Sequence, residues 1–269
     1  MTDIAYYKKQ GRDLTRLLLA NSFPIAVKML RSANEIPENA VRPIKDLKHH
    51  IAVCQGFAMS RREGKTVASL KEDMWCFEPV VGFGLAEPPV RFLEGHNRYP
   101  MTAKTLQAGK TWARNMPRLP MNTYIGVVSS PLEKVEFEPD LVIVYCDNAQ
   151  LTQLLMAANW IDGHDVESRL SAHAACVYTI ATLLEKQNFS VCAPCQGDHR
   201  RALAQDNEII FGISINKLSA LMEALNVLDK NALGLPVKFT MALEYELEPS
   251  YAEFGAELGI NTSSNKTKK

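Results

Sequence analysis

The chain has 269 residues, of which 46% are hydrophobic and 22% are charged, a composition that excludes a chain disordered along its whole length. Lys+Arg and Asp+Glu number 30 each, so the formal net charge is zero and no basic excess exists to bind a nucleic-acid backbone. The longest apolar runs fall far short of the ~20 residues that span a bilayer, and the first residues lack a signal-peptide pattern. We therefore expect a cytoplasmic protein with no nucleic-acid or membrane partner.

Hydrophobic patterns predict alternating helices and strands along the chain. The expected helices cover residues 3–20, 46–62, 102–115, 149–160, 165–186 and 216–228. The expected strands cover residues 24–29, 66–69, 124–128, 141–145, 189–192, 208–213 and 238–246. The apolar run 141–145 is typical of a strand buried on both faces. This order predicts an α/β (mixed α+β) domain over residues 1–235, a closing strand and C-terminal extension over 236–260, and a disordered tail over 261–269.

Four short blocks recur in the same order and predict an internally duplicated αβ unit. Its two pseudo-symmetric halves, about residues 22–125 and 137–230, form one globular domain. The blocks pair residues 24–27 with 139–142, 52–54 with 174–176, 76 with 195, and 81–85 with 209–213. Duplicated halves usually pack around a pseudo-two-fold axis, which brings equivalent residues together. We therefore expect four thiols to converge between the halves, those of Cys54, Cys76, Cys176 and Cys195.

The same stretches carry a resemblance to a known family. The shared features are Pro-Ile-Ala-Val-Lys at 24–28, Cys54-Gln55, Cys76 before a glycine-containing apolar run, Pro139-Asp140, Cys176, and Cys195-Gln196-Gly197 followed by Arg200. The chain resembles the domain-of-unknown-function 169 (DUF169) family of bacterial and archaeal proteins, over residues 10–230. Family members typically read Cys-x-Gly-x-Arg where this chain has one additional residue, His199. The family has no assigned function, so the resemblance supports the fold and marks Gln55, Gly197 and Arg200 as candidate cofactor-binding residues.

Four converging thiolates are the ligands of a [4Fe–4S] cluster or of a tetrahedral zinc ion. The sequence lacks the closely spaced cysteine run of many ferredoxins, so binding requires the fold to gather the ligands. We expect Cys54, Cys76, Cys176 and Cys195 to be metal ligands, with a [4Fe–4S] cluster as the cofactor and zinc as the alternative. The expected function is electron transfer or redox chemistry on a small molecule. His50 lies four residues before Cys54, so the two are expected on one helix face, where they could ligate a metal or activate a thiol. His173, three residues before Cys176, is a secondary ligand candidate.

Three alternatives stay open. The Cys192-Ala193-Pro194-Cys195 motif is typical of thiol–disulfide redox proteins, in which a helix N-terminus lowers the thiol pKa. A non-catalytic small-molecule-binding or accessory protein needs no metal. Free cysteines also often only pack in the core. The partner is expected to be a small molecule or a redox partner protein, and a homo-oligomer is compatible with the sequence; whether the protein is an enzyme, and its catalytic residues, stay open.

Overall fold

The computed structural model of this chain describes residues 4–236 and 249–260. The chain divides into two units, residues 1–236 and 237–269. In the second unit, helix α10 spans Pro249–Glu257. The predicted closing strand over 238–246 and the predicted tail over 261–269 lie outside the described residues.

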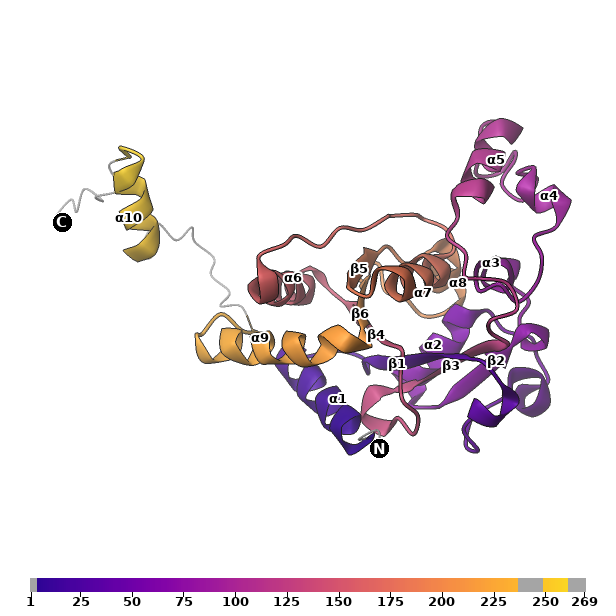
Figure 1. Cartoon of the computed structure of the whole chain (residues 1–269), viewed down its shortest axis with the longest axis horizontal. Coiled ribbons are helices and arrows are strands. Elements are labelled where there is room, and N and C mark those ends of the chain that lie inside the picture. The colour runs from indigo at the N-terminus through magenta and orange to yellow at the C-terminus, as the bar shows by residue number, and fades with distance from the viewer. Residues whose placement is uncertain (1–3, 237–248, 261–269) are drawn as a thin grey trace. The chain divides into compact units, whose positions relative to one another are not determined.

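An antiparallel sheet of six strands forms the centre of the first unit (Figure 1). Its strands are β1 (Ile25–Leu30), β2 (Val67–Leu70), β3 (Gly126–Pro131), β4 (Leu141–Cys146), β5 (Phe189–Cys192) and β6 (Ile209–Ser214). They lie in the order β2-β3-β1-β4-β6-β5. β1 pairs with β3, and β4 with β6, over six residues each. β1 and β4 join the two halves of the sheet through three residue pairs alone.

Read outward from the centre, each half of the sheet has the same kind of strand order: β1, β3, β2 on one side and β4, β6, β5 on the other. Three of the four predicted equivalences occupy matching places in it. Residues 24–27 and 139–142 lead into β1 and β4, residues 52–54 and 174–176 begin helices α2 and α7, and Cys76 and Cys195 each precede a short helix. The fourth is wrong, because residues 81–85 end a helix whereas 209–213 lie in β6. The duplication itself stays a prediction.

Helices cover both faces of the sheet. One face carries α1 (Ile4–Leu18), α6 (Asn148–Asp162) and α9 (Leu218–Lys230), and the other carries α2 (Val53–Glu63) and α7 (Ala175–Lys186). On β4, Val142 and Val144 pack in the core between the sheet and helices α1, α6 and α9. Leu141 and Ile143 pack in the core on the opposite face, beside α2 and α7. The predicted burial of this strand on both faces is confirmed, and it explains the continuous apolar run.

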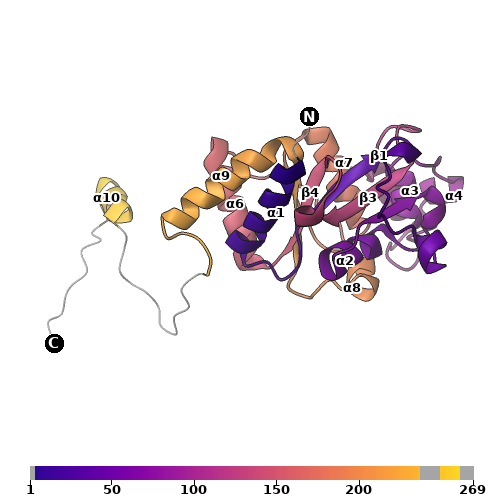
Figure 2. The ribbon, with the colours of Figure 1, turned by 90° about the horizontal axis from the view of Figure 1, so that it is seen from below.

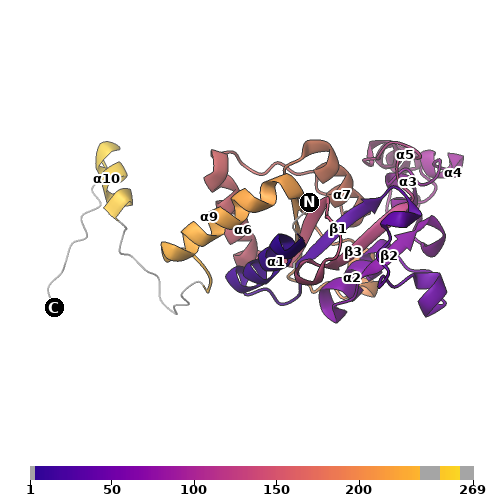
Figure 3. The same ribbon diagram turned by 60° about the horizontal axis from the view of Figure 1, so that its bottom comes forward.

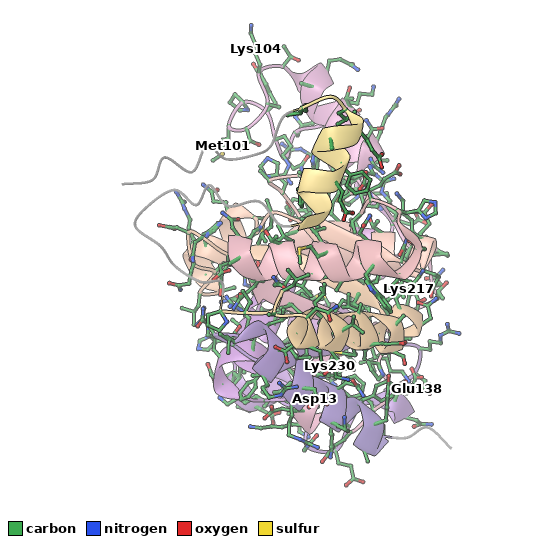
Figure 4. The ribbon with its side chains drawn as sticks, turned by 90° about the vertical axis from the view of Figure 1, so that its left-hand side faces the viewer. Asp13, Met101, Lys104, Glu138, Lys217 and Lys230 are labelled. Carbon is green, nitrogen blue, oxygen red and sulfur yellow. The ribbon has the colours of Figure 1, made fainter. Side chains whose placement is uncertain are left out.

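The helices of the first face are also in contact with one another. α9 packs along both α6 and α1 (Figure 3), and Figure 4 labels Asp13 on α1 and Lys230 at the end of α9. An ion pair of 4.0 Å between Arg16 and Asp229 links these two helices at the surface. Among the described residues, no helix is both long and apolar enough to cross a bilayer.

Short helices complete the first unit. They are α3 (Phe77–Gly82), α4 (Val90–Leu93), α5 (Leu106–Asn115) and α8 (Gln196–Arg201), with single turns η1 (Ala33–Glu35), η2 (Pro43–Leu47), η3 (Lys71–Asp73), η4 (Leu132–Lys134) and η5 (Ile215–Lys217). α4 and α5 stand off from the sheet (Figure 1). The segment that joins these two helices carries Met101 and Lys104, labelled in Figure 4, and Met101 is 90% exposed.

Two predicted helices are wrong in extent. The helix expected over 165–186 begins only at Ala175, and Leu170, placed on its apolar stripe, is 67% exposed. The residue before it, Ala174, adopts the left-handed conformation (φ 54°), which no continuing right-handed helix allows. The helix expected over 46–62 begins at Val53 and follows the separate π-helical turn Pro43–Leu47.

Candidate functional site

The four cysteines predicted to converge all line one cavity of about 280 Å³. Cys54 lies in the first turn of α2 and Cys176 in the first turn of α7. Cys76 immediately precedes α3, and Cys195 immediately precedes α8. Each half of the sheet therefore contributes two thiols, and each thiol is carried at the beginning of a different helix.

Close helix contacts bring these helix starts together. α2 lies beside α8 (Figure 2), and α3 packs against α7. At the second contact, a Cβ atom on Gly82 of α3 would overlap the side chain of Val177 on α7. The glycine therefore permits the approach that places Cys76 near Cys176, because any larger residue would push the two helices apart.

The environment of the thiols favours their neutral form. Burial raises the pKa of Cys54 well above its usual range, with further contributions from the negative charges of Asp198, Cys195 and Cys76. Burial, followed by the neighbouring cysteines, likewise raises the pKa of Cys176, and burial raises the pKa of Cys195 to about 11. Each thiolate thus disfavours the others, so the four can ionise together only if a cation or cationic cluster compensates their charge.

A buried arginine lies beside two of the thiols. Arg98 donates to Glu78 Oε1 (Nη2–Oε1 3.0 Å), and Cys76 Sγ donates to the other oxygen of Glu78 (3.2 Å). The guanidinium group also lies 3.9 Å from the ring centroid of Trp112 and 3.2 Å from His173 Nδ1. Its Nε is buried without a hydrogen-bond partner. Burial lowers the pKa of Arg98, and the negative charges of Glu78, Cys76 and Cys195 oppose that effect.

A second buried group lies under Cys195. The Asp198 carboxylate accepts a hydrogen bond from the Cys195 backbone N–H (3.0 Å) and another from the Tyr145 hydroxyl (2.8 Å). Arg61 lies 4.0 Å from the Tyr145 ring centroid and forms an ion pair of 2.9 Å with Glu208. The start of α8 is therefore anchored to the central strand β4 through Asp198 and Tyr145, and Arg61 links α2 to the segment after α8.

Of the three candidate cofactor-binding residues marked by the family resemblance, two line the cavity and one does not. Gly197 lines the cavity, and a Cβ on it would lie 3.4 Å from Cys195 Sγ and 3.9 Å from Cys54 Sγ. Arg200 also lines the cavity. Gln55 is not among the lining residues; its side-chain oxygen accepts hydrogen bonds from the Ala52 backbone N–H (2.9 Å) and from Trp75 Nε1 (3.1 Å). Gln55 thus positions Trp75, which does line the cavity.

Of the two histidines considered from the sequence, only His173 lies at the cavity. His173 lines the cavity, where burial and the nearby Arg98 charge lower its pKa. The placement of His50 on one helix face with Cys54 is wrong, because α2 begins only at Val53 and His50 is exposed outside the helix. Within residues 4–236 and 249–260, no group of three or more His, Cys, Asp or Glu side chains is arranged to hold a metal ion.

The remaining two cysteines lie apart from the cavity lining. Cys192 is buried in the core and its Sγ contacts the Ala193 carbonyl oxygen at 3.5 Å. Burial raises the pKa of Cys192 to about 11, as it does for Cys195. A thiol–disulfide redox site depends on a lowered thiol pKa, so the surroundings of this motif do not favour that alternative.

Comparison with known proteins places the chain in a family. A family model named DUF169 and described as uncharacterised ArCR matches residues 13–224. The chain belongs to the DUF169 family. This DUF169 protein is 21% identical over 226 residues to the uncharacterized protein MJ0308 of Methanocaldococcus jannaschii, a match that covers 83% of this chain and 95% of that relative. No solved structure matches this DUF169 protein.

Sequence reasoning missed several residues of the DUF169 cavity, above all Trp75, Glu78 and Arg98. Trp75 directly precedes Cys76 and Glu78 follows it by two residues, and this proximity was a usable signal. Arg98 lies in an irregular segment between α4 and α5, and no periodic pattern connects it with a cysteine. Asp198 had a local signal, since a carboxylate three residues after Cys195 is placed to accept the backbone N–H at the start of a helix.

Proposed function

We propose that the protein binds an iron–sulfur cluster of the [4Fe–4S] type through Cys54, Cys76, Cys176 and Cys195, and that it serves electron transfer or a redox reaction on a small molecule. The observation that carries the proposal is the convergence of these four thiols, from four separate helix starts, on one cavity. Four thiolates are the usual ligand set of such clusters. When bound, the cluster would supply reversible uptake of one electron.

Two features of the cavity fit an iron–sulfur cluster: open space next to two of the sulfurs, and a free hydrogen-bond donor. Gly197 leaves open the space between Cys195 and Cys54 that a side chain at this position would enter. The unpartnered Nε of Arg98 supplies a buried donor on a residue that lines the same cavity, and hydrogen bonds to sulfur are among the factors that set cluster potentials.

The size of the cavity favours a cluster over a single zinc ion. Four sulfurs that bind one zinc ion at ~2.3 Å surround it closely and leave no further space between them. The four thiols here line a cavity of about 280 Å³ together with twelve other residues, so the cavity as a whole has room for a group larger than one ion. Zinc therefore remains the alternative that the experiment below distinguishes.

The charges around the cavity also suit an anionic cluster. Arg98 lies at the buried end near two cysteines, and the Glu78 carboxylate that pairs with it also accepts from Cys76. A cluster held by four thiolates carries net negative charge, and a buried negative charge requires nearby compensation. Arg98, although paired with Glu78, would supply part of that compensation without being a ligand.

Elemental analysis of anaerobically prepared protein tests the proposal. We expect stoichiometric iron and sulfide, with a broad absorbance near about 400 nm, where iron–sulfur charge transfer lies. Replacing Cys54 or Cys176 by Ala should remove that absorbance, whereas Cys146→Ala should keep it, because Cys146 is buried in the core on the other face of the sheet. A colourless protein that contains zinc would show that the four cysteines form a zinc site and would refute the cluster. A colourless protein without metal, or full iron occupancy in a ligand variant, would refute the proposal.

A further inference from the structure

The rim of the thiol-lined cavity is distinct from its buried end. Trp75, Arg200 and Arg201 line the cavity and are exposed to solvent, Trp75 to 46%. The Arg201 guanidinium lies 5.1 Å from the Trp75 ring centroid. The described part of the chain offers the Arg200 side chain no hydrogen bond or ion pair. A ligand that enters the cavity therefore meets two unneutralised guanidinium groups before it reaches the thiols.

Apart from the four cysteines, the side chains that line the cavity carry more positive than negative charge. Three arginines line it against a single carboxylate, Glu78, which is already paired with Arg98 at 3.0 Å. Arg98 is mostly buried, and its Glu78 partner also accepts a hydrogen bond from Cys76, so Arg98 is the arginine that would offset part of a negative charge on the cysteines. Arg200 and Arg201 are exposed, and solvent screens their effect on the buried thiols. Their charge is therefore available to a ligand at the rim.

The walls of the cavity indicate what else the ligand carries. Ala52, Ala172 and Ala174 present small apolar side chains, and Trp75 presents an aromatic ring. An inorganic oxyanion gains nothing from such surfaces, whereas a flat organic group gains by burying its apolar area and by stacking on tryptophan. A guanidinium group forms paired parallel hydrogen bonds with a carboxylate.

We propose that the cavity binds a small planar organic carboxylate, with the carboxylate on Arg200 and Arg201 and the flat apolar part directed between Trp75 and the thiols. Because it assigns a ligand to the same cavity, this inference rests on the proposed function and names its substrate class. Gln196 and Gly197, which separate Cys195 from Arg200 along the chain, also line the cavity.

Isothermal titration of the anaerobically prepared protein with benzoate tests this inference. We expect benzoate to bind, and neutral benzamide, which has the same shape, to bind at least about tenfold more weakly, because hydrogen bonds to charged groups contribute at that level. Arg200→Gln and Arg201→Gln should each weaken benzoate binding by a similar factor. Arg12→Gln, an exposed arginine on α1, is the matched control and should leave binding unchanged.

The other outcomes are decisive. Inorganic phosphate that binds as tightly as benzoate would overturn the organic part of the assignment. Benzoate that does not bind, or that binds equally well to the Arg200 and Arg201 variants, would overturn the site. Iron analysis of the same samples separates this result from the proposed function: iron-loaded protein without benzoate binding refutes this inference alone, and metal-free protein that binds benzoate refutes the cluster alone.

Discussion

Arg61 is the largest fully buried polar side chain of the described residues, and its replacement by Met removes a charge from the core. Its guanidinium donates to Glu208 Oε1 (2.9 Å) and to the Leu203 carbonyl (2.9 Å), and it stacks over Tyr145. The Glu208 side chain is itself only 7% exposed. Arg61→Met therefore leaves a nearly buried carboxylate and a carbonyl without their main donor.

The size of the effect follows from these contacts. Removing one partner of a buried ion pair typically costs 3–5 kcal/mol. Arg62 Nη2 also lies 3.0 Å from Glu208 Oε1 and retains part of the pairing. We therefore expect Arg61→Met to lower the free energy of unfolding by about 3 kcal/mol, the lower end of that range. Combining it with Glu208→Gln removes the unpaired charge and should recover about 1 kcal/mol or more of this loss.

Urea denaturation of the metal-free protein measures this difference. Arg12→Met on the exposed face of α1 is the control and should change the free energy of unfolding by less than about 0.5 kcal/mol. A loss below about 1 kcal/mol for Arg61→Met, or a double variant that is less stable than the single one, would refute the reasoning. Because Arg61 links α2 to the loop after α8, the variant should also retain less iron under the same preparation.

Three further changes have defined outcomes. Gly197→Ala should sharply reduce iron incorporation, because its Cβ would enter the space beside two sulfurs, while stability of the metal-free protein changes by no more than about 1 kcal/mol. Tyr145→Phe should lower the free energy of unfolding by about 1.5–3 kcal/mol, because it removes a hydrogen bond of 2.8 Å to buried Asp198. In metal-free protein, alkylation of Cys195 should accelerate up to a pH of about 11 without an earlier plateau, because the thiolate is the reactive form.

Each of these has a matched control. His199→Ala, an exposed neighbour on α8 that does not line the cavity, should leave iron content unchanged, and equal iron in the Gly197 variant would contradict the steric argument. Tyr99→Phe, at a 45% exposed position, should leave stability unchanged in urea denaturation. For Cys195, mass spectrometry of the alkylated peptide gives the rate, and a plateau near or below a pH of about 8 would indicate a lowered pKa and restore the thiol–disulfide alternative.

The raised thiol pKa values also set the pH dependence of stability in the metal-free protein. The pKa of Cys195 rises from 9.0 to about 11 on folding. The unfolded chain therefore loses this proton first as pH increases, and the folded state holds it longer. The free energy of unfolding should fall between these two pH values, by up to ~1.4 kcal/mol per pH unit for each such thiol. Urea denaturation at pH 8 and at pH 10 measures this loss, and Cys195→Ala should diminish it.

Much of the fold was predictable because burial leaves a periodic pattern. The apolar run 141–145 marked a strand covered on both sides, and the structure confirms it as β4. The segment before Ala175 could not be judged in this way, because Val166 and Leu170 match a helical stripe by spacing alone. The left-handed Ala174 that separates this segment from α7 leaves no mark in the sequence, since glycine or asparagine would be the usual signal.

The cavity was predictable in its cysteines and not in its charged residues. The predicted repeat pointed to the four thiols, and the starts of four helices bring them to one cavity. Arg98 reaches the thiols from an irregular segment between α4 and α5, held there by Glu78 and Trp112. Contacts of this kind depend on tertiary packing, for which the sequence offers no local pattern.

The junction of β1 with β4 bears on what the proposed cluster would do for the fold. Three residue pairs make this seam, against six in each adjoining pair of strands, so it is the weakest line across the sheet. Cys54 and Cys76 lie on one side of it, Cys176 and Cys195 on the other. A cluster bound by all four sulfurs would link the two sides of this junction. Its removal should accelerate amide hydrogen exchange at residues 25–27 and 141–143 before exchange in the outer strands changes.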